Sequence, residues 1–252
     1  MARFSGKVAL VTGGGTGIGK ATAIAFAKDG AKVVIANRNE ANGRAVADQI
    51  RKAGGEAVFV RTDVTREADI EAAVRETVAK YGRLDIAFNN SGTEGNGSWV
   101  AEETVENYNT VFNANVLGVL LSMKHEIRQM RKQGGGGAII NNGSIASSIG
   151  MPGAAVYIAS KHAVLGLTRS AALEVAKEGI RINQVSPGGI ETEMLDRFTQ
   201  APGMREYLTN LHPVGRLGKS EEIASAVLWL ASSESSFVNG HDLRVDGGFT
   251  VP

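Results

Sequence analysis

Residues Lys7–Gly19 read KVALVTGGGTGIG, and this stretch decides the fold class. Its first six residues, Lys7–Thr12, form a short apolar run that predicts a buried strand. A glycine-rich turn follows directly, and Gly17–Asp29 then predicts a helix. A strand that turns at once into a helix is the first half of a βαβ unit, so this stretch favours a parallel sheet.

The rest of the chain repeats the alternation of short apolar runs and longer helical stretches. Helices are predicted at Glu40–Ala53 and Glu67–Tyr81. Right-handed crossovers make such a chain a doubly wound α/β fold of Rossmann type, with helices on both faces of one parallel sheet. We expect a single domain over residues 1–252, because the glycines of Gly134–Gly137 suit a helix-to-strand turn better than a linker. The further strands are predicted at Lys32–Ala36, Ala57–Arg61, Leu84–Asn89, Gly137–Asn141, Arg181–Val185 and Asp242–Val245.

The composition excludes several kinds of site. The net charge is +1, which gives no electrostatic reason to expect a nucleic acid or an anionic membrane as partner. No cysteine is present, so disulfides, thiolate nucleophiles and zinc–thiolate sites are excluded, and the four histidines lack metal-ligand spacing. The first apolar run is shorter than a signal peptide or a membrane span requires. We therefore expect a cytoplasmic protein without a metal.

The glycine-rich turn, Thr12–Gly19, has the sequence TGGGTGIG. Glycines at such a strand-to-helix turn let the backbone approach a pyrophosphate, and the helix behind them offers unpaired N–H groups. The spacing is Gly13-x-x-x-Gly17-x-Gly19 rather than the commoner G-x-G-x-x-G. A tight turn would use glycines anyway, but at the first strand-to-helix junction the pattern favours dinucleotide binding.

The end of the second strand bears on which dinucleotide is bound. An acidic residue there would bind the adenosine ribose and repel a 2′-phosphate, whereas this chain has Asn37 and Arg38. Arg38 is suited to a charge-assisted contact with a 2′-phosphate, and Asn37 adds no repulsion. We expect NADP to be preferred. In the alternative, Arg38 stacks on the adenine and NAD is accepted through Asn37.

Tyr157 and Lys161 lie four residues apart and so share one face of a predicted helix. An unperturbed phenol has a pKa of about 10, and a nearby ammonium is expected to lower it toward neutral pH. Ser144 follows a predicted strand thirteen residues before Tyr157, where its hydroxyl is suited to contact a substrate oxygen. Each motif alone also has a purely structural interpretation: Tyr157 and Lys161 as a pair on an exposed helix face, and Ser144 as a turn residue.

The full set of motifs resembles the short-chain dehydrogenase/reductase family from Lys7 to the Asp246-Gly247-Gly248 tail. Within this family the chain resembles 3-oxoacyl-carrier-protein reductases and glucose 1-dehydrogenase-like members. The family usually has alanine where this chain has Ser91. Besides the glycine loop, the resemblance rests on Asp63-Val64, Asn89-Asn90-Ser91-Gly92, Asn115, Ser144, Tyr157-x-x-x-Lys161 and Pro187-Gly188-Gly189-Ile190-Glu191-Thr192.

The resemblance implies an NAD(P)-dependent oxidoreductase that acts on a ketone or a secondary alcohol. Tyr157 would be the acid or base, Lys161 would hold the nicotinamide ribose, Ser144 would polarise the substrate oxygen, and Asn115 would hold a relay water or pin a helix bulge. The expected cofactor-binding residues are Gly13, Gly15, Thr16, Gly17, Ile18, Gly19, Asn37, Arg38, Asp63, Val64, Asn90, Ser91, Gly92, Tyr157, Lys161, Pro187, Gly188, Ile190 and Thr192.

Family members are commonly homotetramers, which here implies contacts through helices near Glu102–Lys132 and Ala154–Lys177. The irregular stretch 188–213 is expected to form a lid over the substrate. The pocket walls are expected to be apolar, through Trp99, Ile149, Met151, Met194 and Phe198.

The substrate itself stays open among four enzymes: a carbonyl reductase, a 3-oxoacyl-carrier-protein reductase, a sugar dehydrogenase and a cyclic-diol dehydrogenase. Carrier-protein reductases dock their acidic partner on basic helix residues. Arg128 fits one such position, but Leu173 stands where a second arginine is expected. A dinucleotide sensor without catalysis is an alternative of a different class.

Overall fold

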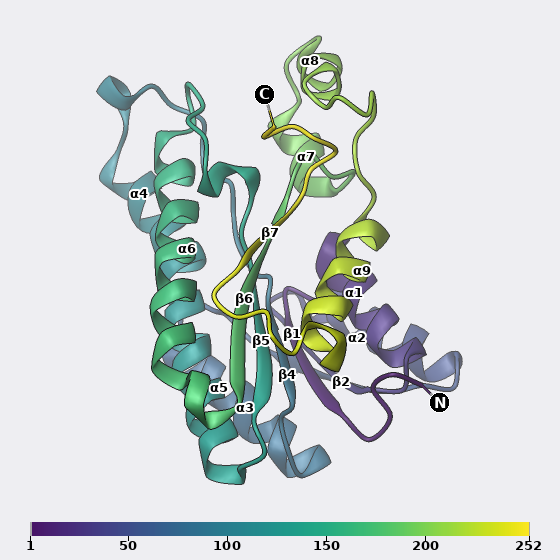
Figure 1. The fold of residues 1–252 in the computed structure, drawn as a ribbon. Coiled ribbons are helices and arrows are strands. Elements are labelled where there is room, and N and C mark those ends of the chain that lie inside the picture. Colours follow the sequence, from purple (N-terminus) through teal and green to yellow (C-terminus); the bar gives the residue numbers. More distant parts are fainter. Residues whose placement is uncertain (1, 252) are drawn as a thin grey trace.

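The computed structural model describes residues 2–251, and its centre is one parallel sheet of seven strands (Figure 1). The strand order is β3-β2-β1-β4-β5-β6-β7, which is the doubly wound arrangement that the sequence predicts. The chain reverses its direction of winding between β1 and β4. The strands are β1 (Val8–Thr12), β2 (Lys32–Asn37), β3 (Glu56–Arg61), β4 (Ile86–Asn89), β5 (Gly137–Asn142), β6 (Ile180–Pro187) and β7 (Asp242–Val245).

Helices cover both faces of the sheet (Figure 1). One face carries α1 (Gly17–Lys28), α2 (Glu40–Lys52) and α9 (Ser220–Ala231), and the other carries α3 (Glu67–Tyr81), α5 (Gly118–Gln133) and α6 (Ala155–Val175). Alternate residues of each strand point to opposite faces of the sheet. In β1, Val11 therefore packs on the face that carries α1, α2 and α9, and Leu10 packs on the face that carries α3, α5 and α6.

The predicted elements are present, with shifts of one or two residues at most ends. The clearest difference is in the helix expected at Glu102–Lys132. It is divided into α4 (Val105–Phe112), a π-helical turn at Asn113–Leu117, and α5. The helix expected at Ala154–Lys177 is α6, followed by a 3₁₀ turn at Ala176–Glu178.

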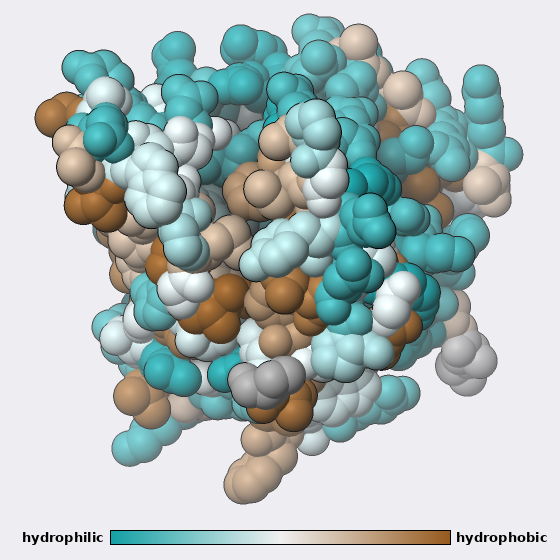
Figure 2. Space-filling view, turned by 90° about the horizontal axis from the view of Figure 1, so that it is seen from above, coloured by the Kyte–Doolittle hydropathy of each residue, from teal (hydrophilic) through white to brown (hydrophobic). Residues whose placement is uncertain are grey.

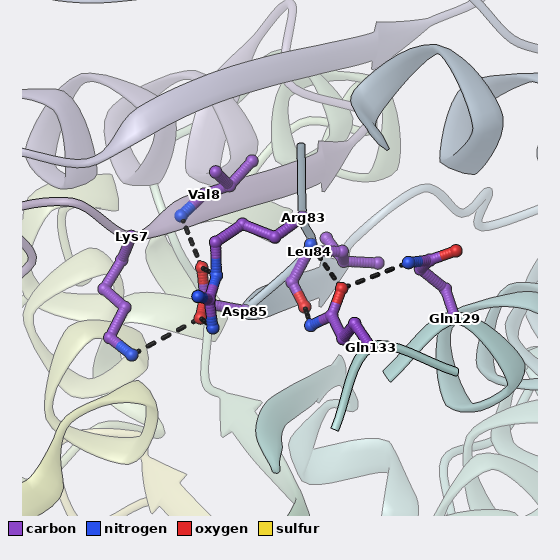
Figure 3. Close-up of polar contacts among 7 residues, drawn as sticks. All are labelled: Lys7, Val8, Arg83, Leu84, Asp85, Gln129 and Gln133. Carbon is purple, nitrogen blue, oxygen red and sulfur yellow. Dashed lines mark hydrogen bonds and ion pairs between the residues drawn. The ribbon is translucent and has the colours of Figure 1, made fainter. Parts of the chain in front are cut away.

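The amino ends of the strands are joined by a polar cluster (Figure 3). Asp85 accepts hydrogen bonds from the backbone N–H of Val8 and from the side chains of Lys7 and Arg83. Gln133, the last residue of α5, contacts both the N–H and the carbonyl of Leu84. These contacts tie the start of β4 to β1 and to α5.

The carboxyl ends of the strands carry the loops in which the candidate site residues lie. Two short helices, α7 (Glu193–Phe198) and α8 (Met204–Asn210), stand above this edge of the sheet (Figure 1). Figure 2 views the molecule from this side, where hydrophilic residues form most of the rim and hydrophobic residues gather nearer the middle. In residues 2–251, no helix is long and apolar enough to cross a membrane.

Candidate active site

The glycine loop turns sharply from β1 into α1 and leaves no room for side chains. Gly13 has φ +64°, a conformation that favours glycine, and a Cβ there would lie 2.8 Å from Nδ2 of Asn90. A Cβ on Gly19 would lie 2.3 Å from the carbonyl oxygen of Gly13. The side chain of Thr16 makes no capping hydrogen bond, so it leaves the N–H groups of the first turn of α1 open to a ligand.

A cavity of about 660 Å³ opens beside this loop and brings together most of the residues expected to bind a cofactor. Its wall comes from the ends of β1, β2, β3, β4 and β5, the position where an α/β sheet of this order binds ligands. A narrow loop bordered by such a cavity fits an extended dinucleotide. The expected residues that line it are Gly13, Thr16, Gly17, Ile18, Asn37, Arg38, Asp63, Val64, Asn90, Ser91, Gly92 and Thr192.

Other expected residues do not line this cavity. Gly15 and Gly19 support the loop from behind, since a Cβ on Gly15 would lie 2.6 Å from Nδ2 of Asn37. Ile190 is buried in the hydrophobic core, and the backbone N–H of Gly188 bonds back to β7. Pro187 is the last residue of β6. These residues shape the site indirectly.

Asparagine side chains join the loops at the carboxyl edge. Asn90 donates to the carbonyls of Thr12 and Gly13 and accepts a hydrogen bond from Asn142. Asn142 also lines the cavity, and its buried Oδ1 has no partner among residues 2–251. The sequence analysis missed Asn142, although its place at the end of a buried strand would have been a signal.

Asn115 lies in the π-helical turn and is 1% exposed. It accepts a hydrogen bond from the N–H of Thr93 and donates to the carbonyl of Thr93 and to Oγ of Ser160. These bonds join the loop after β4 to α6. Asn115 thus lies in a helix bulge and ties it to both neighbours, and π-turns of this kind occur often at functional sites.

Ser144, Tyr157 and Lys161 converge next to the cavity. Ser144 follows β5 and caps a 3₁₀ turn through the N–H of Ala146. Tyr157 and Lys161 lie one turn apart on α6, and Nζ of Lys161 is 5.7 Å from the centre of the Tyr157 ring. Nζ also donates to the carbonyl of Asn142 at 2.9 Å. A hydroxyl, a phenol and a buried ammonium thus meet beside the glycine-loop cavity.

Comparison with known proteins identifies this arrangement. The family model described as enoyl-(acyl carrier protein) reductase matches residues 13–250. A 2,5-dichloro-2,5-cyclohexadiene-1,4-diol dehydrogenase of Sphingobium indicum is 42% identical over 252 residues, all of both chains. A solved short-chain type dehydrogenase/reductase from Mycobacterium marinum has a TM-score of 0.95 and 37% identity, over 99% of this chain and 97% of that one. The chain belongs to the short-chain dehydrogenase/reductase family.

A further solved relative is a 3-ketoacyl-(acyl-carrier-protein) reductase from Brucella melitensis complexed with NADH. It has a TM-score of 0.92 and 35% identity, over 98% of this chain and 99% of that one. As a short-chain dehydrogenase/reductase, the chain is an oxidoreductase that moves hydride between a nicotinamide dinucleotide and an alcohol or ketone.

The pKa of Tyr157 in this short-chain dehydrogenase/reductase shifts in the direction opposite to the one expected from the sequence. Burial raises the pKa of Tyr157, the neighbouring Ser144 hydroxyl lowers it, and the Glu94 carboxylate raises it further. The prediction of a lowered pKa is therefore wrong for this structure, because burial disfavours the phenolate more than the Ser144 hydrogen bond favours it. Burial also lowers the pKa of Lys161 to about 8.

A second, small cavity borders Tyr157. Phe198 lines it, but Trp99 is 68% exposed and does not. Met194 lines the larger cavity instead. Of the five apolar side chains expected in the pocket wall, Phe198 and Met194 each line one of the two cavities, whereas Trp99, Ile149 and Met151 line neither. The other residues that line the small cavity are Glu94, Gly95, Asn96, Gly97, Glu103, Gly153, Ala154 and Val156.

Proposed function

We propose that the chain is a carbonyl reductase that prefers NADPH and uses Tyr157 as its acid or base. The observation that carries this proposal is the meeting of Ser144, Tyr157 and Lys161 beside the glycine-loop cavity. In reduction, Tyr157 donates a proton to the oxygen of the ketone. In oxidation, it takes the proton of the alcohol.

The neighbouring groups support this proton transfer. Ser144 donates a hydrogen bond to the reacting oxygen and stabilises the negative charge that develops there. Lys161 holds positive charge near the phenol and would donate to the ribose hydroxyls of a bound dinucleotide. Asn115 keeps the loop after β4 against α6 and holds a relay water. A bound nicotinamide supplies or takes up the hydride.

Replacing the phenol tests the role of Tyr157. We expect Tyr157→Phe to lower turnover at least about a hundredfold, the usual scale for losing a general acid. The fluorescence of bound NADPH should show nearly unchanged affinity, because the aromatic ring stays in place. Turnover is measured from the absorbance of the reduced nicotinamide with a panel of ketones and secondary alcohols. Turnover close to that of the unaltered protein would refute the mechanism.

The preference for NADP rests on Arg38. Its exposed guanidinium lines the cavity at the end of β2 and makes no ion pair or hydrogen bond with residues 2–251. Asn37 beside it is committed to the carbonyl of Asn39 and carries no charge. An unpaired guanidinium at this position suits a 2′-phosphate.

The matching experiment compares the two dinucleotides. Arg38→Leu should raise the KM for NADP at least about tenfold, the scale of one charge-assisted contact, and leave the KM for NAD within about twofold. Arg44, which pairs with Glu40 on α2, offers a control of the same residue type. Equal effects of Arg38→Leu on both constants would contradict the NADP preference.

Among substrates, we favour a cyclic secondary alcohol or ketone over a carrier-bound thioester. The Sphingobium relative is named for a cyclic diol. Leu173, at the position where a carrier-protein reductase needs a second arginine, is 82% exposed and offers no charge. Assays with cyclohexanol, glucose and acetoacetyl thioesters separate these classes, as well as the sugar dehydrogenase alternative.

The lid, the assembly and the location are also proposals. Met194 and Arg197 of α7 line the cavity, which supports a lid over about 188–213. Exposed apolar side chains on α4, α5 and α6 support a homotetramer, whose mass light scattering would measure. They are Tyr108, Leu120 and Leu173. A cytoplasmic location stays a prediction that rests on the family.

A further inference from the structure

An ion pair joins α7 to the loop that follows β4. Nε of Arg197 donates to one carboxylate oxygen of Glu94 at 2.7 Å, and Nη2 donates to the other at 3.3 Å. The two residues are 103 positions apart in the sequence. The Glu94 side chain is only 15% exposed, whereas that of Arg197 is 55% exposed. Two parallel bonds between a guanidinium and a carboxylate fix the orientation of both groups.

This ion pair lies between the two cavities. Arg197 lines the larger cavity, where the dinucleotide is expected. Glu94 lines the small cavity together with Tyr157 and with Phe198 of α7. The carboxylate therefore faces the catalytic phenol on one side and the guanidinium on the other. Breaking the ion pair is therefore expected to change both the charge next to Tyr157 and the position of α7.

Several charged groups surround Tyr157 and the pair. Lys161 approaches the phenol from its own helix, and Glu94 approaches it from the loop after β4. Glu103, also on the small cavity, accepts hydrogen bonds from Asn107 and from the backbone N–H of Thr104. Glu193 of α7 lies near Arg197, and its carboxylate raises the pKa of Arg197 because it favours the charged guanidinium. Arg197 is the cation in direct contact with the carboxylate that faces Tyr157.

We propose that Arg197 is a positioning residue, which holds α7 beside Tyr157 and masks the negative charge of Glu94 from the phenol. The proposal rests on the function assigned above to Tyr157. Without the guanidinium, a bare carboxylate faces the phenol and opposes its ionisation, because like charges repel in a partly buried site. Without Glu94, the opposing charge is gone, although the tether to α7 is lost as well.

Three variants separate the charge effect from the tether: Arg197→Gln, Glu94→Gln and the double variant. The ionisation of Tyr157 is followed by its phenolate absorbance, as the difference between each variant and the same variant carrying Tyr157→Phe. We expect Arg197→Gln to raise the titration midpoint by about one pH unit. Glu94→Gln should not raise the midpoint, and the double variant should match Glu94→Gln. This readout does not depend on enzyme activity.

The tether is measured by kinetics of alcohol oxidation with cyclohexanol and NADP⁺ as probes. The KM for cyclohexanol should rise by a similar factor, about threefold to tenfold, in all three variants, as expected for a loss of about 1 kcal/mol of positioning. The pH at which kcat/KM reaches half its maximum should move upward in Arg197→Gln alone. Arg205→Gln is the matched control, because Arg205 pairs with Asp196 of the same lid at 2.7 Å and does not contact Glu94. It should leave both pH midpoints unchanged.

The outcomes distinguish this inference from the proposed function. Equal phenolate midpoints in Arg197→Gln and Glu94→Gln would overturn the inference, whether or not Tyr157 is catalytic. Separate phenolate midpoints without any change in the pH profile of kcat/KM would support the masking of Glu94. That same result would refute the assignment of Tyr157 as the acid or base.

Discussion

The two ends of the parallel sheet differ in whether their buried polar side chains have hydrogen-bond partners. At the amino end, Asp85 contacts a backbone N–H and two cationic side chains, and Gln133 contacts both backbone groups of Leu84 (Figure 3). Toward the carboxyl end, three buried side-chain oxygens have no partner among residues 2–251, and they belong to Asn89, Asn142 and Gln184. Of these three residues, Asn142 alone lines the glycine-loop cavity, so its buried oxygen is the one placed where an α/β sheet of this order binds ligands.

The buried charged groups at the two ends also differ, in whether a group of opposite charge lies next to them. The Asp85 carboxylate at the amino end is 7% exposed and lies within 2.6 Å of Arg83 and 3.3 Å of Lys7. The Lys161 ammonium at the carboxyl end is 6% exposed and has a neutral carbonyl as its protein partner. A buried charge without a counter-charge is costly, and burial lowers the pKa of Lys161 from 10.5 to about 8. The comparison therefore predicts opposite effects of mutation at the two ends.

The largest expected effect is at Lys161. Lys161→Met should lower kcat/KM at least about a hundredfold, since the proton transfer loses its supporting charge. The same change should raise the free energy of unfolding at pH 7 by about 2 kcal/mol, because an apolar side chain of similar length replaces an unpaired buried ammonium. Urea denaturation and steady-state kinetics measure the two effects. A variant that is both inactive and less stable would contradict the comparison.

The pH dependence of this stability difference gives a sharper test. Below pH 8, Lys161 is protonated in both the folded and the unfolded chain, so its full destabilising effect is present. Between pH 8 and 10.5 the folded chain releases this proton while the unfolded chain retains it, so the stability of the unaltered protein rises relative to Lys161→Met. The gain from Lys161→Met should therefore shrink as the pH rises through this window.

The next effect is at the amino end. Asp85→Ala should lower the free energy of unfolding by about 3 kcal/mol, because it leaves the buried N–H of Val8 without a partner and two cations without a counter-charge. It should leave kcat within about twofold, since the site lies at the other end of the sheet. Asp48→Ala is the control, because Asp48 pairs with Arg51 at the exposed surface of α2 and such pairs contribute less than about 1 kcal/mol.

The sequence predicts features that depend on local pattern. Neighbouring residues predict the glycine turn after β1, the doubly wound sheet, and the placement of Tyr157 and Lys161 one turn apart on a helix. The structure agrees with each of these predictions. Features that depend on packing could not be predicted in this way. A glutamate in a helix is usually expected at the solvent-exposed face, yet Glu126 of α5 is only 1% exposed and accepts a hydrogen bond from Asn89. Burial raises the pKa of Glu126 to about 8.

The small cavity shows the same limit. Trp99 was expected in the pocket wall because it is large and apolar, but the loop that carries it turns outward and leaves it exposed. The loop Thr93–Trp99, which contains Glu94, is expected in the pocket wall, and Glu94 does line the small cavity. Nothing in the local sequence, however, places Glu94 against Arg197 of α7. The pKa of Tyr157 likewise depends on burial, which the four-residue spacing to Lys161 does not report. Long-range contacts decide all three.

The smallest expected effect is at Ser91, where the family usually has alanine. The backbone N–H of Ser91 donates to Oγ1 of Thr12, so the main chain is already held at the end of β1. The hydroxyl of Ser91 makes no hydrogen bond with another group of residues 2–251, although the residue lines the cavity. Ser91→Ala should therefore change the free energy of unfolding by less than about 0.5 kcal/mol and the KM for NADP by less than about twofold.

This near-neutral result would sharpen the comparison between the two ends of the sheet. Asn142, which lines the same cavity, has a buried oxygen without a partner, whereas Ser91 has its backbone satisfied and its hydroxyl free to rotate. If Ser91→Ala instead raised the KM for NADP tenfold, the hydroxyl would be a ligand of the dinucleotide. The groups available to a ligand at the carboxyl ends of the strands would then include a hydroxyl as well as an amide oxygen. Family members with alanine at this position would bind the same cofactor without that contact.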